Sequence, residues 1–298
     1  MTNVFAELSD ALANTVATAG AGVVRVEGRQ RIPATGIVWS ADGLIVTAHH
    51  VVSRDDNIQI GLPDGRTVSA ALVGRDPSTD TAVLRAEATG LTPLAESNKQ
   101  ELGVGNLVLA LGRPGKTVQA TLGIVSALGD SWRTRMGGQI DRYLQTDVVM
   151  YPGFSGGPLV DAHGRLAGMN TSALLGGVSL AIPTATLARV ADALVSDGRM
   201  KRGYLGVSTQ RVKLPNDLRE QLGQKSGLLI VSAEPDSPAS AAGLTLGDTI
   251  VTLDGEKVRD HDDLLALLSG DRVGTAVPVG ILRGGQVQQM QITIGERE

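Results

Sequence analysis

The chain has 298 residues, enough for two or three compact units, and 42% of them are hydrophobic, which is typical of a folded globular protein. Lys and Arg number 27 against 31 Asp and Glu, so the net charge of −4 favours neither nucleic acid nor an anionic membrane as a partner. Cysteine is absent, which excludes disulfides, thiolate catalysis and cysteine-based zinc sites. The 4 histidines show no metal-ligand spacing, so we expect no metal and no other cofactor.

The N-terminal segment predicts an amphipathic helix from about residue 4 to residue 17. Its apolar residues recur at helical spacing: Val4, Phe5, Leu8, Leu12 and Val16. The segment has no basic stretch at its start and carries Glu7 and Asp10, so it does not predict a signal peptide. No later stretch approaches the roughly 20 apolar residues of a membrane-spanning helix. The compartment stays open between a cytoplasmic protein and an exported one whose leader has been removed.

Short strands bounded by Gly, Pro and Asp follow as far as Ile182, a pattern typical of β-barrels. One apolar strand ends at His49 and His50, and His50 is our candidate general base, although a histidine there is more often a hydrogen-bonded core residue. Asp80 stands where a turn enters another apolar strand. A partly buried carboxylate needs a partner, and a histidine N–H can be one.

The segment at residues 151–159 places Ser155 among glycines. An acyl-transfer serine needs backbone N–H donors aimed at the developing oxyanion, and these approach closely only where side chains are absent. Gly153 N–H and Ser155 N–H would form that oxyanion hole. Alone, the pattern is weak evidence, because a Gly/Ser turn between strands has the same appearance.

The order His50, Asp80, Ser155 is that of chymotrypsin-like triads. The Gly-x-Ser-x-Gly pattern also occurs in α/β-hydrolases, where the acid and histidine follow the serine and a helix begins directly after it. Residues 158–169 instead predict a hairpin, which argues against that alternative.

The C-terminal third predicts a second unit. A helix is expected at residues 184–196, and a polar linker with 3 basic residues follows it. Beyond the linker we expect a strand at 227–231, a turn at Asp254 and Gly255, a helix at about 262–268 and a hairpin at 283–285. Leu264, Leu265 and Leu268 are expected mainly in the core of this unit.

The residues at 47–52, 76–84, 145–147, 152–158 and 179–183 together resemble the HtrA/Deg family of serine proteases, and the match runs over nearly the whole chain. The resemblance implies a mainly β fold, with a chymotrypsin-like double β-barrel followed by a PDZ domain. It places the protease domain at residues 1–197, the linker at 198–202 and the PDZ domain at 203–298.

The same resemblance implies roles for individual residues. Carried over position by position, it makes the catalytic triad His50, Asp80 and Ser155, with His49 only a neighbour. It assigns the pocket for the substrate side chain to Val149, Met150 and Leu180, which favours small or medium aliphatic residues. It assigns the carboxylate-binding loop of the PDZ domain, which grips a peptide's C-terminus while the peptide adds as a strand, to Tyr204, Leu205, Gly206 and Val207.

By this resemblance we expect an ATP-independent serine endopeptidase that degrades unfolded or misfolded proteins. Phe154 departs from the Asn usual in the family directly before the serine, and it cannot receive a buried ammonium. It therefore keeps open a catalytically weak, peptide-binding chaperone on the same fold; a serine esterase is a more distant alternative.

Two expectations concern assembly and regulation. Family members form homotrimers through the N-terminal segment, often with aromatic residues, and Phe5 lies on the apolar stripe of the first helix. The family also uses a loop equivalent to residues 129–138 to sense PDZ ligands or neighbouring subunits. Trp132, Arg133 and Arg135 are the side chains expected to make that contact.

Overall fold

The structure is a computed structural model that describes residues 3–30, 32–97, 102–201, 203–268 and 272–296. The chain divides into two compact units, Met1–Met200 and Lys201–Glu298. The division falls within the predicted linker, whose residue 202 lies outside the described residues, as do residues 1–2 and 297–298 at the ends of the predicted domains.

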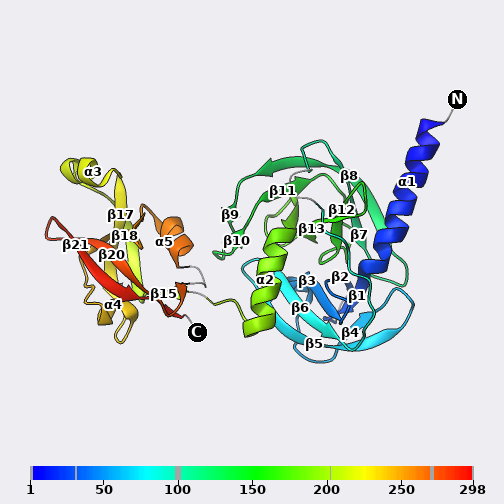
Figure 1. The fold of residues 1–298 in the computed structure, drawn as a ribbon, viewed down its shortest axis with the longest axis horizontal. Helices are drawn as coiled ribbons and strands as arrows, with labels where there is room; N and C mark the ends of the chain where they lie inside the picture. The colour runs from blue at the N-terminus through cyan, green and yellow to red at the C-terminus, as the bar shows by residue number, and fades with distance from the viewer. Residues whose placement is uncertain (1–2, 31, 98–101, 202, 269–271, 297–298) are drawn as a thin grey trace. The chain divides into compact units, whose positions relative to one another are not determined.

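The first unit contains two closed antiparallel barrels of six strands each (Figure 1). The strands of the first barrel, in their order around it, are β1 (Val23–Glu27), β2 (Ala34–Val38), β3 (Leu44–Ala48), β6 (Thr81–Ala86), β5 (Thr67–Asp76) and β4 (Ile58–Gly61). Those of the second are β11 (Tyr143–Thr146), β14 (Ser179–Pro183), β13 (Leu166–Thr171), β12 (Pro158–Asp161), β7 (Leu107–Gly112) and β8 (Gln119–Gly129). The predicted mainly β fold with a double barrel is confirmed.

The barrel cores are aliphatic because the chain has only 2 Phe, 3 Tyr and 2 Trp. In the first barrel, Ile37, Ile45 and Leu84 are among the largest fully buried side chains. Phe154, in the second barrel, is the one aromatic side chain among the largest fully buried ones of the described residues. Barrel closure removes the free sheet edges, so each barrel strand pairs with a neighbour on both sides.

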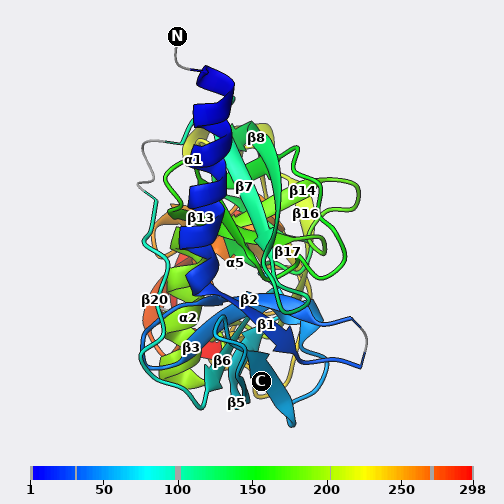
Figure 2. The same ribbon diagram turned by 90° about the vertical axis from the view of Figure 1, so that its right-hand side faces the viewer.

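Helix α1 (Val4–Ala19) begins at Asn3, whose side chain accepts a hydrogen bond from Ala6 N–H. Its C-terminal half packs with Leu12 and Val16 on a buried cluster of the second barrel. Its N-terminal half extends past the barrels (Figure 2) and leaves Phe5 84% exposed. No helix in the described ranges is long and apolar enough to cross a membrane.

Helix α2 (Thr184–Asp197) agrees closely with the predicted helix at 184–196 and packs on β5, β6 and β13. It ends at Gly198, whose φ of +71° is the left-handed conformation that closes many helices. The predicted loop at 129–138 contains part of a small ribbon formed by β9 (Trp132–Arg133) and β10 (Gln139–Ile140).

The second unit is built on a sheet in the order β16–β17–β18–β20–β21, with β19 paired to β18. Its strands are β16 (Val207–Lys213), β17 (Ser226–Ala233), β18 (Thr249–Leu253), β19 (Glu256–Lys257), β20 (Ala276–Arg283) and β21 (Gln286–Thr293). A separate ribbon joins β15 (Gly203–Tyr204) to β22 (Gly295–Glu296). The helices are α3 (Asn216–Leu222), α4 (Pro238–Ala241) and α5 (His261–Leu267), and β16 is an edge strand of the sheet.

Helix α5 lies within one residue of the helix expected at about 262–268. It begins at Asp260, whose side chain accepts from Asp263 N–H at 3.1 Å. Leu264 is buried in the core of the second unit as expected, whereas Leu265 is exposed.

A half-buried ion pair joins the residue before β18 to the end of β20. Arg283 Nε and Nη2 each donate at 2.7 Å to the Asp248 carboxylate, whose side chain is 2% exposed. Hydrogen bonding from Arg283 lowers the pKa of Asp248 below its ordinary value of 3.8, despite the opposing effect of burial. As the pH falls, the Asp248 carboxylate is therefore protonated first in the unfolded chain. The ion pair stabilises the folded protein above the ordinary pKa of 3.8, and this contribution is lost as the pH falls below it.

We expect Asp248→Asn to lower the free energy of unfolding by about 1–2 kcal/mol at neutral pH, because it weakens two charge-assisted hydrogen bonds to a partly exposed Arg283. It should also flatten the fall in stability between about pH 5 and pH 2. Urea denaturation at a series of pH values measures both. The matched control is Asp254→Asn, which removes a more exposed pair to Arg272 at 3.3 Å and should cost less than about 1 kcal/mol. Equal losses in the two variants would contradict the interpretation.

Candidate active site

His50 lies in a short 3-10 turn (His49–Val51) directly after β3, and its ring is fixed by Asp80. His50 Nδ1 is 2.9 Å from Asp80 Oδ2 and 3.0 Å from Oδ1, and the backbone N–H of His50 donates to Oδ1 at 3.0 Å. The carboxylate thus orients both the backbone and the imidazole. With the proton on Nδ1, Nε2 is left as the basic nitrogen.

A polar turn presents the Asp80 carboxylate. Asp80 has a φ of +54°, in the left-handed region that Asp and Asn tolerate better than other side chains. The buried Asp76 carboxylate shapes this turn by accepting from Ser78 N–H at 3.0 Å, from the Ser78 hydroxyl at 2.6 Å and from the Thr79 hydroxyl at 2.7 Å. Asp76 therefore supports the turn, as its place before Pro77 indicates.

Thr171, at the end of β13, donates its hydroxyl to Asp80 Oδ2. Thr171 belongs to the second barrel and Asp80 to the first, so the carboxylate joins the two barrels. Sequence reasoning missed Thr171. No local pattern marks a threonine at a strand end, and the contact depends on how the barrels pack.

The turn before Ser155 consists of residues 151–154, closed by a 3.0 Å hydrogen bond from Phe154 N–H to the Tyr151 carbonyl. Pro152 and Gly153 take its second and third positions, and the φ of +92° at Gly153 is typical of a type II turn. The Thr35 hydroxyl donates to the Gly153 carbonyl at 2.6 Å. Among the described residues, neither Gly153 N–H nor Ser155 N–H meets an acceptor, as the oxyanion-hole prediction requires.

Phe154 is 0% exposed, and its ring fills part of the apolar cluster inside the second barrel. The ring packs edge-on against Tyr151, with centroids 5.7 Å apart and planes at 83°. Its space exists because residue 112 is a glycine: a Cβ there would lie 2.5 Å from a Phe154 ring carbon. Apolar packing of Phe154 thus holds the turn.

Ser155 lies against the first barrel. A Cβ on the next residue, Gly156, would stand 2.2 Å from the Thr35 carbonyl and 2.9 Å from the backbone nitrogen of Ala48. The chain at Ser155 therefore passes directly beside the end of β3, close to His50. In this structure the Ser155 hydroxyl lies 3.3 Å from the Ser172 hydroxyl, and its hydrogen bonds to described residues do not include His50.

The three residues assigned to the substrate pocket lie in different surroundings. Leu180 is buried on β14, and Met150 packs against the apolar cluster around Phe154. Val149 is 56% exposed, and its carbonyl accepts from the Thr121 hydroxyl at 2.9 Å. Val149 therefore lacks the burial expected of a pocket floor.

The ribbon at residues 132–140 is tied to its own unit. The Thr134 hydroxyl donates to the Ser78 carbonyl at 2.7 Å, next to the turn that carries Asp80. Trp132 is partly buried and packs edge-on against Tyr143, while Arg133 bonds to Gly137 and Gln139. Arg135 remains exposed, so it is the candidate sensing side chain that is free at the surface.

The loop at residues 204–207 of the second unit also contains backbone N–H groups that can act as hydrogen-bond donors. Gly206 has a φ of +76°, and a Cβ there would lie 2.2 Å from Ser237 Cβ, so only glycine fits. The Leu205 carbonyl accepts from Ala239 N–H and the Gly206 carbonyl from Glu234 N–H, both at 2.8 Å. In the described part of the chain no acceptor receives Leu205 N–H or Gly206 N–H.

Family models match both units: a trypsin-like peptidase domain at residues 34–169 and a PDZ domain at residues 203–294. A probable periplasmic serine endoprotease, DegP-like, of Chlamydia trachomatis is 35% identical over 276 residues, covering 91% of this chain and 55% of the relative. One from Ectopseudomonas mendocina is 37% identical over 279 residues, covering 90% and 58%. The chain thus spans about half the length of the curated relatives it matches.

Solved structures match over nearly their whole length. The serine endoprotease from Yersinia pestis is 33% identical with a TM-score of 0.79, covering 96% of this chain and 98% of that one. The HtrA-type protease AlgW with a decapeptide is 30% identical with a TM-score of 0.78 and the same coverage. With the double barrel and the second unit described above, these matches show that the chain belongs to the HtrA/Deg family of serine proteases, with a trypsin-like domain followed by a PDZ domain.

Proposed function

We propose that this protein is an ATP-independent serine endopeptidase that cleaves unfolded or misfolded proteins. The observation that carries the proposal is the two-point contact of Asp80 with the backbone and ring of His50, next to a serine flanked by two free N–H donors. This arrangement supports acyl transfer by the serine.

In the proposed mechanism, a rotation about the Ser155 side chain moves its hydroxyl from Ser172 to His50 Nε2. His50 takes the proton as Ser155 Oγ attacks the scissile carbonyl, and it later returns that proton to the leaving amine. Asp80 stabilises the charged imidazole. Gly153 N–H and Ser155 N–H donate to the oxyanion of the tetrahedral intermediate, and water then releases the acyl group by the same steps.

Phe154 was the reason to consider a catalytically weak chaperone. Its ring is fully buried in the second barrel and leaves the turn before Ser155 closed, which supports the protease over the chaperone. We further propose that residues 204–207 bind the C-terminal carboxylate of peptides through Leu205 N–H and Gly206 N–H. The peptide would then add as a strand along β16.

We expect Ser155→Ala and His50→Ala each to lower kcat for a denatured casein-like substrate by about four to six orders of magnitude, as loss of a triad member does in other serine proteases. The matched control is His49→Ala, because His49 stands beside His50 but its ring makes no hydrogen bond to Asp80. That variant should keep kcat within about tenfold, since only the triad histidine transfers the proton. Undiminished cleavage by Ser155→Ala would refute the proposal.

We expect Gly112→Ala to lower the free energy of unfolding by about 1–3 kcal/mol, because its methyl group overlaps the Phe154 ring. Displacement of the ring should also move the oxyanion turn and lower kcat by about 10- to 100-fold. Gly115→Ala is the control, since a Cβ at that position meets nothing within 4 Å. Thermal unfolding and turnover measure the two effects. Equal thermal stability and equal kcat of the two variants would contradict the role given to the packing of Phe154.

We also propose a homotrimer that buries the N-terminal half of α1, where Phe5 is 84% exposed. Phe5→Ser should then shift the mass measured by light scattering from trimer towards monomer, because the substitution removes the largest and most exposed apolar side chain of this half-helix. Val104→Ser is the control, since Val104 is also an exposed apolar residue, at 63%, but lies outside α1. A monomer mass for the unaltered chain across a wide concentration range would rule out the trimer.

A further inference from the structure

The second unit contains a basic cavity of about 480 Å³ that the proposed mechanism does not use. Its lining residues are Arg211, Val212, Lys213, Arg219, Lys225 and Ser226. Four of these six carry a positive charge, although the chain as a whole has a net charge of −4. The cavity is therefore a local concentration of positive charge in an acidic protein.

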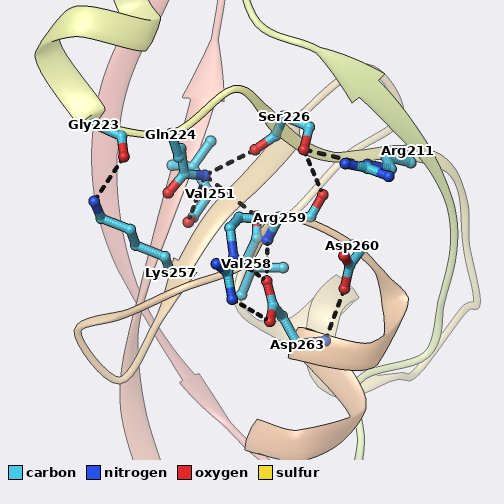
Figure 3. Close-up of polar contacts among 10 residues, drawn as sticks. All are labelled: Arg211, Gly223, Gln224, Ser226, Val251, Lys257, Val258, Arg259, Asp260 and Asp263. Carbon is cyan, nitrogen blue, oxygen red and sulfur yellow. Dashed lines mark hydrogen bonds and ion pairs between the residues drawn. The ribbon is translucent and has the colours of Figure 1, made fainter.

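These cations are not neutralised by carboxylates. Arg211 Nε donates to the Ser226 hydroxyl at 3.3 Å (Figure 3), and Arg219 Nε donates to the Leu214 carbonyl at 2.6 Å. Within the described ranges, no ion pair joins any of the four cationic side chains of the cavity to an acid. An anionic ligand would therefore find unsatisfied charge and guanidinium groups able to bind a carboxylate through two hydrogen bonds.

The acid close to Arg211 already has a partner. Asp263 on α5 accepts from Arg259 Nε at 2.8 Å and from Arg259 Nη2 at 2.9 Å, the paired contact visible in Figure 3. Hydrogen bonding from Arg259 is the main cause of the lowered pKa of Asp263, and the charge of Arg211 adds a smaller effect. Arg211 thus lies near a negative charge that is shared with another arginine, and the cavity keeps an excess of positive charge.

The cavity lies at the far end of the strand along which a peptide would add. β16 is an edge strand, and the Thr209 carbonyl lies 3.0 Å from His261 Nε2 at the start of α5, so the free edge of β16 faces α5. Residues 204–207, which would bind the carboxylate, come at the beginning of this strand. Arg211 and Lys213 come four and six residues after Val207, or about 13 and 20 Å along it at roughly 3.3 Å per residue.

The direction of the peptide follows from these positions. With its carboxylate at residues 204–207, a peptide on the free edge must run antiparallel to β16, and its upstream residues must approach Lys213. Residues about four to eight positions before the C-terminus then reach the cavity, given strand spacing and the length of the Arg and Lys side chains.

We propose that this basic cavity selects peptides that carry acidic residues about four to eight positions upstream of a hydrophobic C-terminus. The inference rests on the proposed peptide site at residues 204–207, and it adds a specificity element to that site. The loop at residues 204–207 binds the C-terminus of the peptide. The acidic residues of the preceding segment bind the cationic side chains of the cavity, which are Arg211, Lys213, Arg219 and Lys225.

The test uses the full chain with Ser155→Ala, which prevents cleavage, and two fluorescent 12-residue peptides. Both end in the same three hydrophobic residues; one has Glu at all of the positions about four to eight residues before the C-terminus, and the other has Gln there. We expect the Glu peptide to bind about tenfold more tightly at low ionic strength, because several exposed ion pairs each add a small gain. The difference should shrink as salt is added.

Adding Lys213→Gln and Lys225→Gln should remove most of that difference while leaving the affinity for the Gln peptide unchanged. The charge-matched control combines Lys116→Gln and Lys257→Gln, two exposed lysines outside the cavity, and it should keep the tenfold preference. Loss of the preference in this control as well would assign it to net charge and overturn the proposal.

The remaining outcomes separate this inference from the peptide site on which it rests. Equal affinity for the two peptides would overturn the charge selection and leave the peptide site intact. Binding of neither peptide would refute the peptide site and the selection together. Equally tight binding of the Glu peptide after amidation of its C-terminus would show an anion-binding surface independent of residues 204–207, which also overturns the proposal.

Discussion

The protease-like unit depends on one buried carboxylate. A carboxylate in the interior is costly unless hydrogen bonds surround it, and the partners of Asp80 come from two segments of the chain. His50 offers its backbone N–H and Nδ1 from the end of β3, and Thr171 offers its hydroxyl from β13 in the second barrel. Meeting this one requirement fixes the orientation of the imidazole and also the relative position of the two barrels at the active site.

A second constraint acts on the serine side and is apolar. Phe154 occupies the space left by Gly112, and the turn at residues 151–154 is thereby held with Gly153 in its left-handed conformation. The Thr35 hydroxyl, donated from the first barrel to the Gly153 carbonyl, fixes the same turn from the other side. Shape and one hydrogen bond therefore hold the proposed oxyanion donors, which makes Phe154 compatible with the proposed chemistry.

Much of this could be predicted from the sequence, because the information was local. The histidine at a strand end, the Asp80 turn and the glycine-flanked serine each have a recognisable pattern, and helix α2 differs from its predicted range by one residue. The predicted loop at 129–138 was only partly right, since short strands there depend on pairing with residues farther along the chain. Thr171, Thr35 and Gly112 could not be found, because their roles arise from contacts between barrels or strands distant in sequence. The exposure of Val149 likewise could not be predicted, because it depends on the path of the chain after β11.

We propose that Asp80 prepares His50 to activate Ser155, and the rate at which a fluorophosphonate probe labels Ser155 measures this activation. This reaction needs an activated serine. It needs neither a peptide at the PDZ domain nor the unfolding of a protein substrate. Asp80→Asn preserves the shape of the side chain but replaces one carboxylate oxygen, an acceptor, with an amide NH₂ group, a donor. We expect labelling of this variant to slow by about 10³- to 10⁴-fold while the fold is retained. Labelling at the rate of the unaltered protein would contradict it.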